Sequence, residues 1–344
     1  MAAIDFSLVT VVIAVAIFAF TNGFHDAADM VATAIASRAM SPAMAIGIVS
    51  VFTFIAPFTI GLAVADTVGT FVDIGSVSQR AGESVVIAAL AAAVSYNLAT
   101  WVLGYPSSSS NSLAGGLTGA GLYAAGSQHI NWGLAGLLGG ELQGLMKVAT
   151  GLLLSPLFAF LIGYLVMKLL LTVFRHFRHK INRLFVLSQY LSVAWLGFSH
   201  GANDAQKGMA IIGMMLLADG VTSTFSIPAW AIVLCVSAIT LGTMFGGWRI
   251  IKTLGFGLYR LRTLHAVANQ TGSALVNTIA TSFGAPTSTT QVVTATLLGN
   301  GAAEKPGHVK WRTAAGIVMG WWLNLPVSIL LGWLYCALYL TIRS

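Results

Sequence analysis

Long hydrophobic runs follow one another along almost the whole chain, and they leave few choices of fold. A membrane-spanning helix needs about 20 mostly apolar residues. Charged residues make up only 8% of the chain, whereas about a quarter of a typical soluble domain is charged. The sequence therefore predicts an all-α polytopic membrane protein with about 10–12 transmembrane segments, once the shorter apolar pieces are included. The runs of spanning length are 4–35, 43–65, 84–103, 148–167, 189–217, 229–245, 265–283 and 314–340.

Two polar segments, 105–121 and 285–301, interrupt this apolar pattern in the same way. Each contains a proline, Pro106 or Pro286, followed at once by four hydroxyl residues and then by a run of mostly small and apolar residues. Proline has no amide proton and fixes φ, so it breaks or begins a helix. The hydroxyl residues are Ser107, Ser108, Ser109 and Ser110 in the first segment and Thr287, Ser288, Thr289 and Thr290 in the second.

A helix that begins in the middle of a membrane leaves several backbone N–H groups without partners. Such a break survives only inside protein or beside a watery cavity, so we expect two re-entrant Ser/Thr-rich hairpins. The free amides, the positive helix end and the neighbouring hydroxyls together favour a bound anion. A Ser/Thr-rich packing face or an interfacial loop is the alternative for either segment, but two matching copies favour the binding site.

Other motifs recur at nearly the same spacing, which indicates a duplicated unit. FTNGFHDA at 20–27 matches FSHGANDA at 198–205, 178 positions later, and Asn97 matches Asn277, 180 positions later. The loop at 248–262 is basic, whereas its counterpart at 69–83 is mainly acidic, so the positive-inside rule places them on opposite sides of the membrane. We therefore expect two inverted-topology repeats, 1–167 and 188–344, joined by a basic cytoplasmic linker at 168–187.

An aspartate lies within an apolar run in each repeat, Asp26 in the first and Asp204 in the second. An ionisable residue at membrane depth costs at least about 2.5–3.5 kcal/mol and is a functional candidate by default. Such a carboxylate can bind Na⁺, carry a proton or accept a hydrogen bond from a protonated oxyanion. A structural ion pair with Arg38 or Lys207 at a helix end is the alternative, and a pair between Asp29 and Lys207 across the repeats is a further hypothesis.

Glycine and asparagine near each aspartate are typical of a locally unwound helix whose carbonyls bind a cation. Gly23 and Gly201 stand three residues before the aspartates, and we expect unwinding there. For Asn97 and Asn277, hydrogen bonding between helices is an equally good interpretation. The polar candidates for binding a coupling cation, beside the two aspartates, are Asn22, His25, Asn97, Asn203 and Asn277.

Several function classes find no support in the sequence. It contains no phosphate-binding P-loop, no HExxH, no CxxC and no GxSxG, so an enzyme is not expected and neither is a cofactor. The net charge of +7 arises from basic residues in loops between hydrophobic runs, which is the positive-inside pattern and no sign of nucleic-acid binding. Cys235 and Cys336 lie in apolar runs and are expected to be core thiols.

These motifs as a set resemble those of the inorganic phosphate transporter family, PiT. The matching sequences are GFHDA at 23–27, PSSSS at 106–110, GANDA at 201–205, GWRIIKTLG at 247–255 and PTSTT at 286–290. The resemblance implies a symporter that moves inorganic phosphate with Na⁺ or H⁺, with Asp26 and Asp204 essential and the hydroxyls holding phosphate. Many members have a glutamate associated with Na⁺ where this chain has Gln270, which adds Gln270 to the coupling candidates and favours H⁺. Asn111 and Gln291 stand where the family often has histidine.

We therefore expect a secondary active transporter of inorganic phosphate in the cytoplasmic membrane, driven by H⁺ or Na⁺. If Na⁺ is the coupling ion, it binds at Asp26 and Asp204. A carboxylate beside the anion favours phosphate, which keeps a proton near neutral pH, over sulfate, which has none. A sulfate permease on the same scaffold, a passive anion channel and a non-transporting receptor are the alternatives. The expected partners are phosphate, the coupling cation and membrane lipid, with a homo-oligomer left open.

Overall fold

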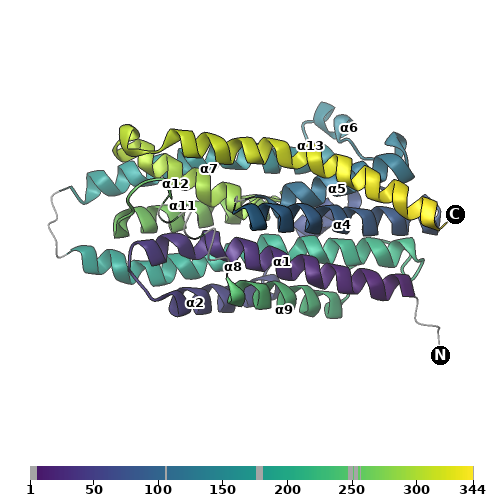
Figure 1. Ribbon diagram of the computed structural model, residues 1–344, viewed down its shortest axis with the longest axis horizontal. Coiled ribbons are helices and arrows are strands. Elements are labelled where there is room, and N and C mark those ends of the chain that lie inside the picture. The colour runs from purple at the N-terminus through teal and green to yellow at the C-terminus, as the bar shows by residue number, and fades with distance from the viewer. Residues whose placement is uncertain are drawn as a thin grey trace.

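The chain folds into a bundle of helices that run roughly along its longest axis (Figure 1). A computed structural model describes residues 6–104, 107–175, 181–246, 251, 255 and 257–343, and these residues contain no β-strand. Pro106 and most of the GWRIIKTLG motif lie outside the described residues. The helices are α1 (Phe6–Ala36), α2 (Pro42–Ile55), α3 (Ala63–Thr70), α4 (Gln79–Leu103), α5 (Ser109–Ala124), α6 (Leu134–Leu138), α7 (Gly144–Val173), α8 (Asn182–Ala218), α9 (Ala229–Phe245), α11 (Thr263–Ser282), α12 (Thr289–Glu304) and α13 (Trp311–Ile342).

The outer surface of the bundle is apolar, as a lipid-facing surface must be. Among the described residues, α1, α4, α7 and α13 are long and apolar enough to cross a membrane, and α2 and α3 add a fifth span if their bent pair counts as one. Leucines recur at every fourth position along the exposed side of α7, and residues four apart lie on one helix face. They are Leu153, Leu157, Leu161, Leu165 and Leu169. The chain is therefore an all-α membrane protein, as the sequence predicts.

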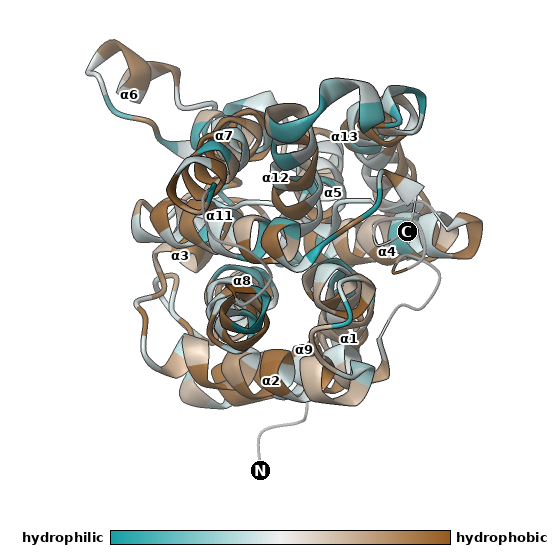
Figure 2. Ribbon diagram, turned by 90° about the vertical axis from the view of Figure 1, so that its left-hand side faces the viewer, coloured by the Kyte–Doolittle hydropathy of each residue, from teal (hydrophilic) through white to brown (hydrophobic). Residues whose placement is uncertain are grey.

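Helices α1 and α8 carry the two aspartate motifs, and they run antiparallel to each other. Ser37, just after the end of α1, donates a hydrogen bond to Gln189 near the start of α8 at 3.1 Å. Asn22, in the middle of α1, donates to Asp204 farther along α8 at 3.2 Å. Figure 2, viewed close to the helix axes, shows α1 and α8 next to each other. Corresponding helices of opposite direction are what an inverted repeat requires.

Both helices remain continuous through their polar motifs, so the unwinding expected at Gly23 and Gly201 is wrong. A Cβ atom on Gly23 would lie 2.0 Å from the carbonyl oxygen of Ile239, and one on Gly201 would lie 2.3 Å from that of Thr53. The glycines are needed because the backbones of α9 and α2 pass directly against these helices, as small residues allow in membrane bundles.

The first Ser/Thr segment forms the tip of an antiparallel hairpin made by α4 and α5. Near the tip, Ser112 on α5 donates to the Asn97 side chain on α4 at 3.0 Å. Farther from the tip, a Cβ atom on Gly116 would lie 2.8 Å from the carbonyl oxygen of Ala89. Helix α5 therefore returns along α4 in close contact, with its N-terminus inside the bundle.

The second segment forms the tip of a matching hairpin made by α11 and α12. Thr287 at the tip donates to Asn277 at 3.2 Å, and Asn269 donates to the carbonyl oxygen of Val293 at 2.8 Å. The two tips touch, because the Ser110 hydroxyl donates to the carbonyl oxygen of Thr287 at 2.7 Å. The N-termini of α5 and α12 thus meet at one place inside the protein.

Two hydrophobic clusters lie on either side of this meeting point. Along α1, Val15 belongs to one cluster and Met30 to the other, and the polar motif lies between them. Along α8 the order is reversed, with Leu196 in the second cluster and Met209 in the first. The polar residues are therefore held at mid-depth between two apolar layers.

Candidate functional site

The helix N-termini of α5 and α12 are built alike. Ser108 and Ser288 have extended backbones, with φ, ψ of −109°, 110° and −105°, 109°. Each side-chain oxygen accepts a hydrogen bond from the backbone N–H three residues later, from Asn111 at 3.1 Å and from Gln291 at 3.3 Å. These are N-caps, which use only one of the free amides in the first turn. The remaining positive charge of both helix ends is directed toward the place where the tips meet.

The next hydroxyl of each tip contacts one of the two continuous helices. Ser109 donates to the Asn22 side chain on α1 at 2.6 Å, and Thr289 lies 3.1 Å from Nδ1 of His200 on α8. Asn22 and His200 occupy equivalent positions of the two repeated motifs, 178 residues apart. His200 is a site residue that the sequence reasoning missed, although its correspondence with Asn22 could have identified it.

A pair of buried carboxylates lies on α1, where the sequence reasoning had singled out only one for a role in transport. The hydroxyl of Thr290 lies 3.0 Å from Asp26 and 2.6 Å from Asp29. Nδ1 of His25 is 3.4 Å from Asp26, and these three side chains can present ligand atoms within 4.8 Å of one another. Two carboxylates buried this closely call for a compensating positive charge.

The aspartate on α8 has a different partner. Asp204 forms an ion pair with Lys207 at 2.8 Å, and both side chains are buried, with at most 2% of each residue exposed. The hypothesis of an Asp29–Lys207 pair is therefore wrong, because the lysine bonds to the carboxylate one turn earlier on its own helix. The alternative of a structural ion pair between Asp204 and Lys207 agrees with this contact, although the pair lies within α8 and not at its end.

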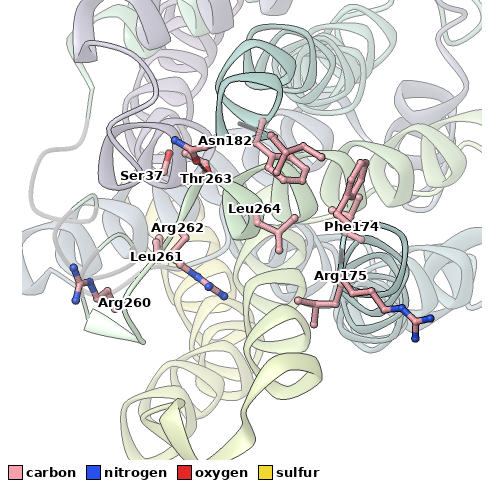
Figure 3. Close-up of a pocket in the computed structure, with 13 residues that line it drawn as sticks. Ser37, Phe174, Arg175, Asn182, Arg260, Leu261, Arg262, Thr263 and Leu264 are labelled. Carbon is pink, nitrogen blue, oxygen red and sulfur yellow. Dashed lines mark hydrogen bonds between the residues drawn. The ribbon is translucent and has the colours of Figure 1, made fainter. Parts of the chain in front are cut away.

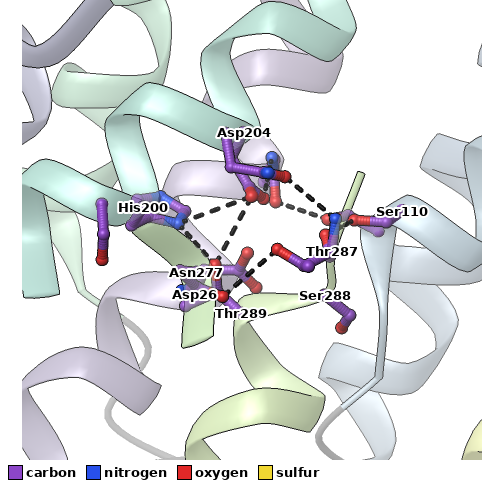
Figure 4. Close-up of polar contacts among 12 residues, drawn as sticks. Asp26, Ser110, His200, Asp204, Asn277, Thr287, Ser288 and Thr289 are labelled. Carbon is purple, nitrogen blue, oxygen red and sulfur yellow. Dashed lines mark hydrogen bonds and ion pairs between the residues drawn. The ribbon is translucent and has the colours of Figure 1, made fainter. Parts of the chain in front are cut away.

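Asp204 is at the centre of the polar cluster shown in Figure 4. It accepts hydrogen bonds from Asn22 on α1 at 3.2 Å and from Thr289 at 3.4 Å. Nδ1 of His200 lies 3.9 Å away. Asp26, His200 and Asp204 can also present ligand atoms within 4.8 Å of one another. The two aspartates predicted from the sequence are therefore brought together with both hairpin tips.

Several predicted residues hold the hairpins in shape. Ser107 bonds to the Thr100 hydroxyl at 2.6 Å within the first hairpin. Asn203 accepts a hydrogen bond from the backbone N–H of Thr287 at 3.1 Å, and donates one to the carbonyl oxygen of Ala285 at 3.2 Å. Asn97 and Asn277 each bond to a hydroxyl of their own hairpin. The interpretation as a hydrogen bond between helices thus agrees with the contact of Asn97, whereas Asn277 bonds to the hairpin tip just before α12.

Gln270 belongs to a separate polar cluster. It accepts a hydrogen bond from Ser192 at 2.6 Å and donates to Thr33 at 3.1 Å and to Gln189 at 3.4 Å. Gln189 in turn accepts from Ser37, which lines a cavity of about 970 Å³ at the end of the bundle (Figure 3). Among the described residues, Gln270 therefore forms no hydrogen bond with Asp26 or Asp204, and a chain of polar side chains connects it to the end of the bundle.

The assembled site brings groups that suit an anion next to groups that suit a cation. Two helix N-termini and several hydroxyls favour an anion, and the carboxylates favour a cation. All eight hydroxyl residues of the two tips are buried, with no more than 4% of each exposed. In this conformation the hydroxyls of the site are therefore closed to solutes from outside the protein.

Comparison with known proteins shows similarity over almost the whole chain. The sequence model described as the phosphate transporter family matches residues 22–332. A probable low-affinity inorganic phosphate transporter of Rhizobium meliloti (strain 1021) is 38% identical over 334 residues, which cover 96% of each chain. One of Bacillus subtilis (strain 168) is 36% identical over 332 residues, 94% of each chain. A solved structure described as a sodium-dependent phosphate transporter shares the fold, with a TM-score of 0.83 over 98% of this chain and 99% of that chain at 22% identity.

Proposed function

The chain belongs to the phosphate transporter family, and on this basis we propose that it carries inorganic phosphate across the cytoplasmic membrane together with a cation. Its relatives and its fold are those of transporters and not of enzymes. The observation that carries the proposal is the contact between Ser110 and Thr287, which joins two helix N-termini beside Asp26 and Asp204.

Phosphate is the anion that this site suits best. Its oxygens would accept hydrogen bonds from the first-turn amides, and from the hydroxyls of Ser109, Ser110, Thr289 and Thr290 after these turn away from their present acceptors. Near neutral pH phosphate also keeps a proton, which it can donate to a carboxylate such as Asp26. Sulfate has no proton to donate at this pH, and its charge would face the carboxylate directly. The buried carboxylates thus support phosphate over the sulfate alternative.

The coupling cation, H⁺ or Na⁺, is proposed to bind at the carboxylates of the first repeat. Asp26 and Asp29 share the Thr290 hydroxyl, with His25 beside them. A cation there would neutralise carboxylates close to the arriving anion, so that cation and phosphate each favour binding of the other. Gln270 hydrogen-bonds to Ser192, Thr33 and Gln189 and to neither carboxylate among the described residues, so we propose that it shapes the path to the site.

We propose further that residues 1–167 and 188–344 are inverted repeats, and that their two hairpins are re-entrant. The antiparallel α1 and α8, the matching 16-residue α5 and α12, and the tip-to-tip contact support this division. Residues 168–187 would form the linker, of which 176–180 lie outside the described residues. Rocking of one repeat against the other would then separate the tips toward alternate sides.

The end of the bundle that holds the linker is proposed to face the cytoplasm. A cavity of about 800 Å³ at this end is lined by Arg38, Arg260, His308 and Lys310, and no acidic residue lines it among those that the structure describes. Arg175 and Arg262 line the neighbouring cavity of Figure 3. Positive charge gathers on the cytoplasmic side of membrane proteins. The same charge would raise the local concentration of phosphate at the mouth of the path.

Uptake of labelled phosphate by proteoliposomes under separately imposed Na⁺ and pH gradients tests the proposal. We expect accumulation above equilibrium with at least one gradient, little competition from sulfate, and loss of accumulation in Asp26→Asn. Uptake that never exceeds equilibrium under either gradient would instead indicate a passive channel. Sulfate that competes as well as unlabelled phosphate would indicate a sulfate permease.

A further inference from the structure

The two aspartate motifs differ in charge at one equivalent position. Three residues after the aspartate, the first motif has Asp29 and the second has Lys207, 178 positions later. Each side chain contacts the last hydroxyl residue of a hairpin tip. Asp29 contacts Thr290, and Lys207 contacts Ser110. The first half of the site therefore has two carboxylates, whereas the second has one carboxylate and an ammonium group.

The ammonium group of Lys207 has a complete set of hydrogen-bond partners. It donates to the Asp204 carboxylate at 2.8 Å, to the Thr287 backbone carbonyl at 2.8 Å and to the Ser110 hydroxyl. A protonated lysine has three N–H donors and no acceptor, so three acceptors match the charged form. No donor remains for a phosphate oxygen, which argues against Lys207 as a direct phosphate ligand in this conformation.

The three partners of Lys207 are also those that a small monovalent cation uses. Carbonyls of unwound backbone are typical ligands of coupling ions in transporters with inverted repeats, and carboxylate and hydroxyl oxygens bind such ions in the same way. The carbonyl belongs to Thr287, which immediately precedes the N-cap of α12. The lysine ammonium, a compact point charge on a flexible stem, fits the same group of oxygens.

We propose that the Lys207 ammonium permanently occupies the place of a coupling cation in the second repeat. Only the first repeat, at Asp26 and Asp29, then exchanges a cation during transport. This inference rests on the proposed transport function. It predicts that this chain exchanges one cation fewer per cycle than the same site would with a neutral residue at position 207.

The substitution Lys207→Asn tests the proposal, because it removes the charge and leaves the three oxygens. We expect the melting temperature of the purified variant to rise with NaCl to a plateau and not with choline chloride, beyond any such rise in the wild type. Phosphate uptake by the variant should then require Na⁺. Lys207→Met, which fills the same space with an apolar side chain, should show no added response to Na⁺.

The matched control is Asp29→Asn at the equivalent position of the first repeat. It removes a carboxylate and should weaken the response to the coupling cation, which is the opposite direction. Two results would overturn the proposal: equal stability of folded Lys207→Asn in NaCl and choline chloride, or its loss of phosphate binding in both salts. The second result would make Lys207 a phosphate ligand.

If Lys207→Asn does not fold in either salt, the double variant Asp26→Asn/Asp29→Asn decides the matter. It keeps Lys207 and removes the exchangeable site, so it should show no stabilisation by Na⁺, and a remaining Na⁺ response would refute the proposal. Failure of the transport function is recognised separately, because the wild type would then not accumulate phosphate at all. Wild-type accumulation with no Na⁺ requirement in Lys207→Asn would refute this inference alone.

Discussion

Breaking the buried Asp204–Lys207 pair from one side should cost far more stability than removing it altogether. In Asp204→Asn, the Lys207 ammonium keeps its bonds to Ser110 and Thr287 and loses the only negative group that it contacts among the described residues. An uncompensated buried charge of this kind costs about 3–5 kcal/mol. The unfolding equilibrium constant should therefore rise roughly 10²- to 10⁴-fold.

The double variant Asp204→Asn/Lys207→Met should recover most of this loss. Replacing a buried ion pair by uncharged groups of similar size is often close to neutral. The structure allows this, because the hydrogen bond from Ser110 to the Thr287 carbonyl, 2.7 Å long, does not depend on an atom of the lysine. The double variant should be well folded and inactive, since its half of the site has lost both charges.

Reversible denaturation in mixed micelles, followed by tryptophan fluorescence, measures the three variants against the wild type. We expect a coupling energy of at least about 2 kcal/mol between the two positions, well above the 0.3–0.5 kcal/mol typical of independent sites. Phosphate uptake in the same preparations separates loss of folding from loss of transport. Additive effects of Asp204→Asn and Lys207→Met on stability would refute the ion-pair reasoning.

Further predictions concern the hairpin tips and the glycine contacts. Thr290→Val removes the hydroxyl shared by the two α1 carboxylates and should abolish phosphate uptake in proteoliposomes, whereas Thr290→Ser should retain it. Ser108→Ala and Ser288→Ala each remove an N-cap and should each lower the free energy of unfolding by about 1 kcal/mol. Unequal decreases, measured by reversible denaturation, would contradict the likeness of the two tips. Gly23→Ala would place its Cβ 2.0 Å from a carbonyl oxygen of α9 and should prevent assembly of a monodisperse protein on size exclusion, whereas Gly316→Ala, with nothing within 4 Å, should be tolerated.

The contacts around the two aspartates show where pattern reasoning succeeds. Asp26 and Asp204 are conspicuous because a carboxylate in an apolar run is costly, and both lie in the polar cluster at mid-depth. His200, Asp29 and Lys207 were harder to assign, although each occupies a position related by the repeat to a residue already noticed. Their roles depend on which hydroxyl approaches them, and that hydroxyl comes from a distant part of the chain.

The glycines show where the same reasoning fails. Glycine beside a buried carboxylate is consistent both with an unwound helix and with a close helix contact, because both need the absence of a side chain. The carbonyls of Ile239 and Thr53 against Gly23 and Gly201 decide for the close contact. A sequence names the small residue, but its neighbour across the interface is set by packing.

The sequence by itself determined that this protein lies in a membrane and is helical, and it identified the two Ser/Thr segments and the two aspartates. It could do so because the length of an apolar run, a proline and a charge within an apolar run are each recognised locally along the chain. Only the tertiary structure decided that the tips touch, that Thr290 joins Asp26 to Asp29 and that Lys207 neutralises Asp204. The first two contacts link residues from opposite halves of the chain. The third pairs Lys207 with one of several polar groups that lie near it. Their free energy comes from distances and desolvation, which exist only after the helices have packed.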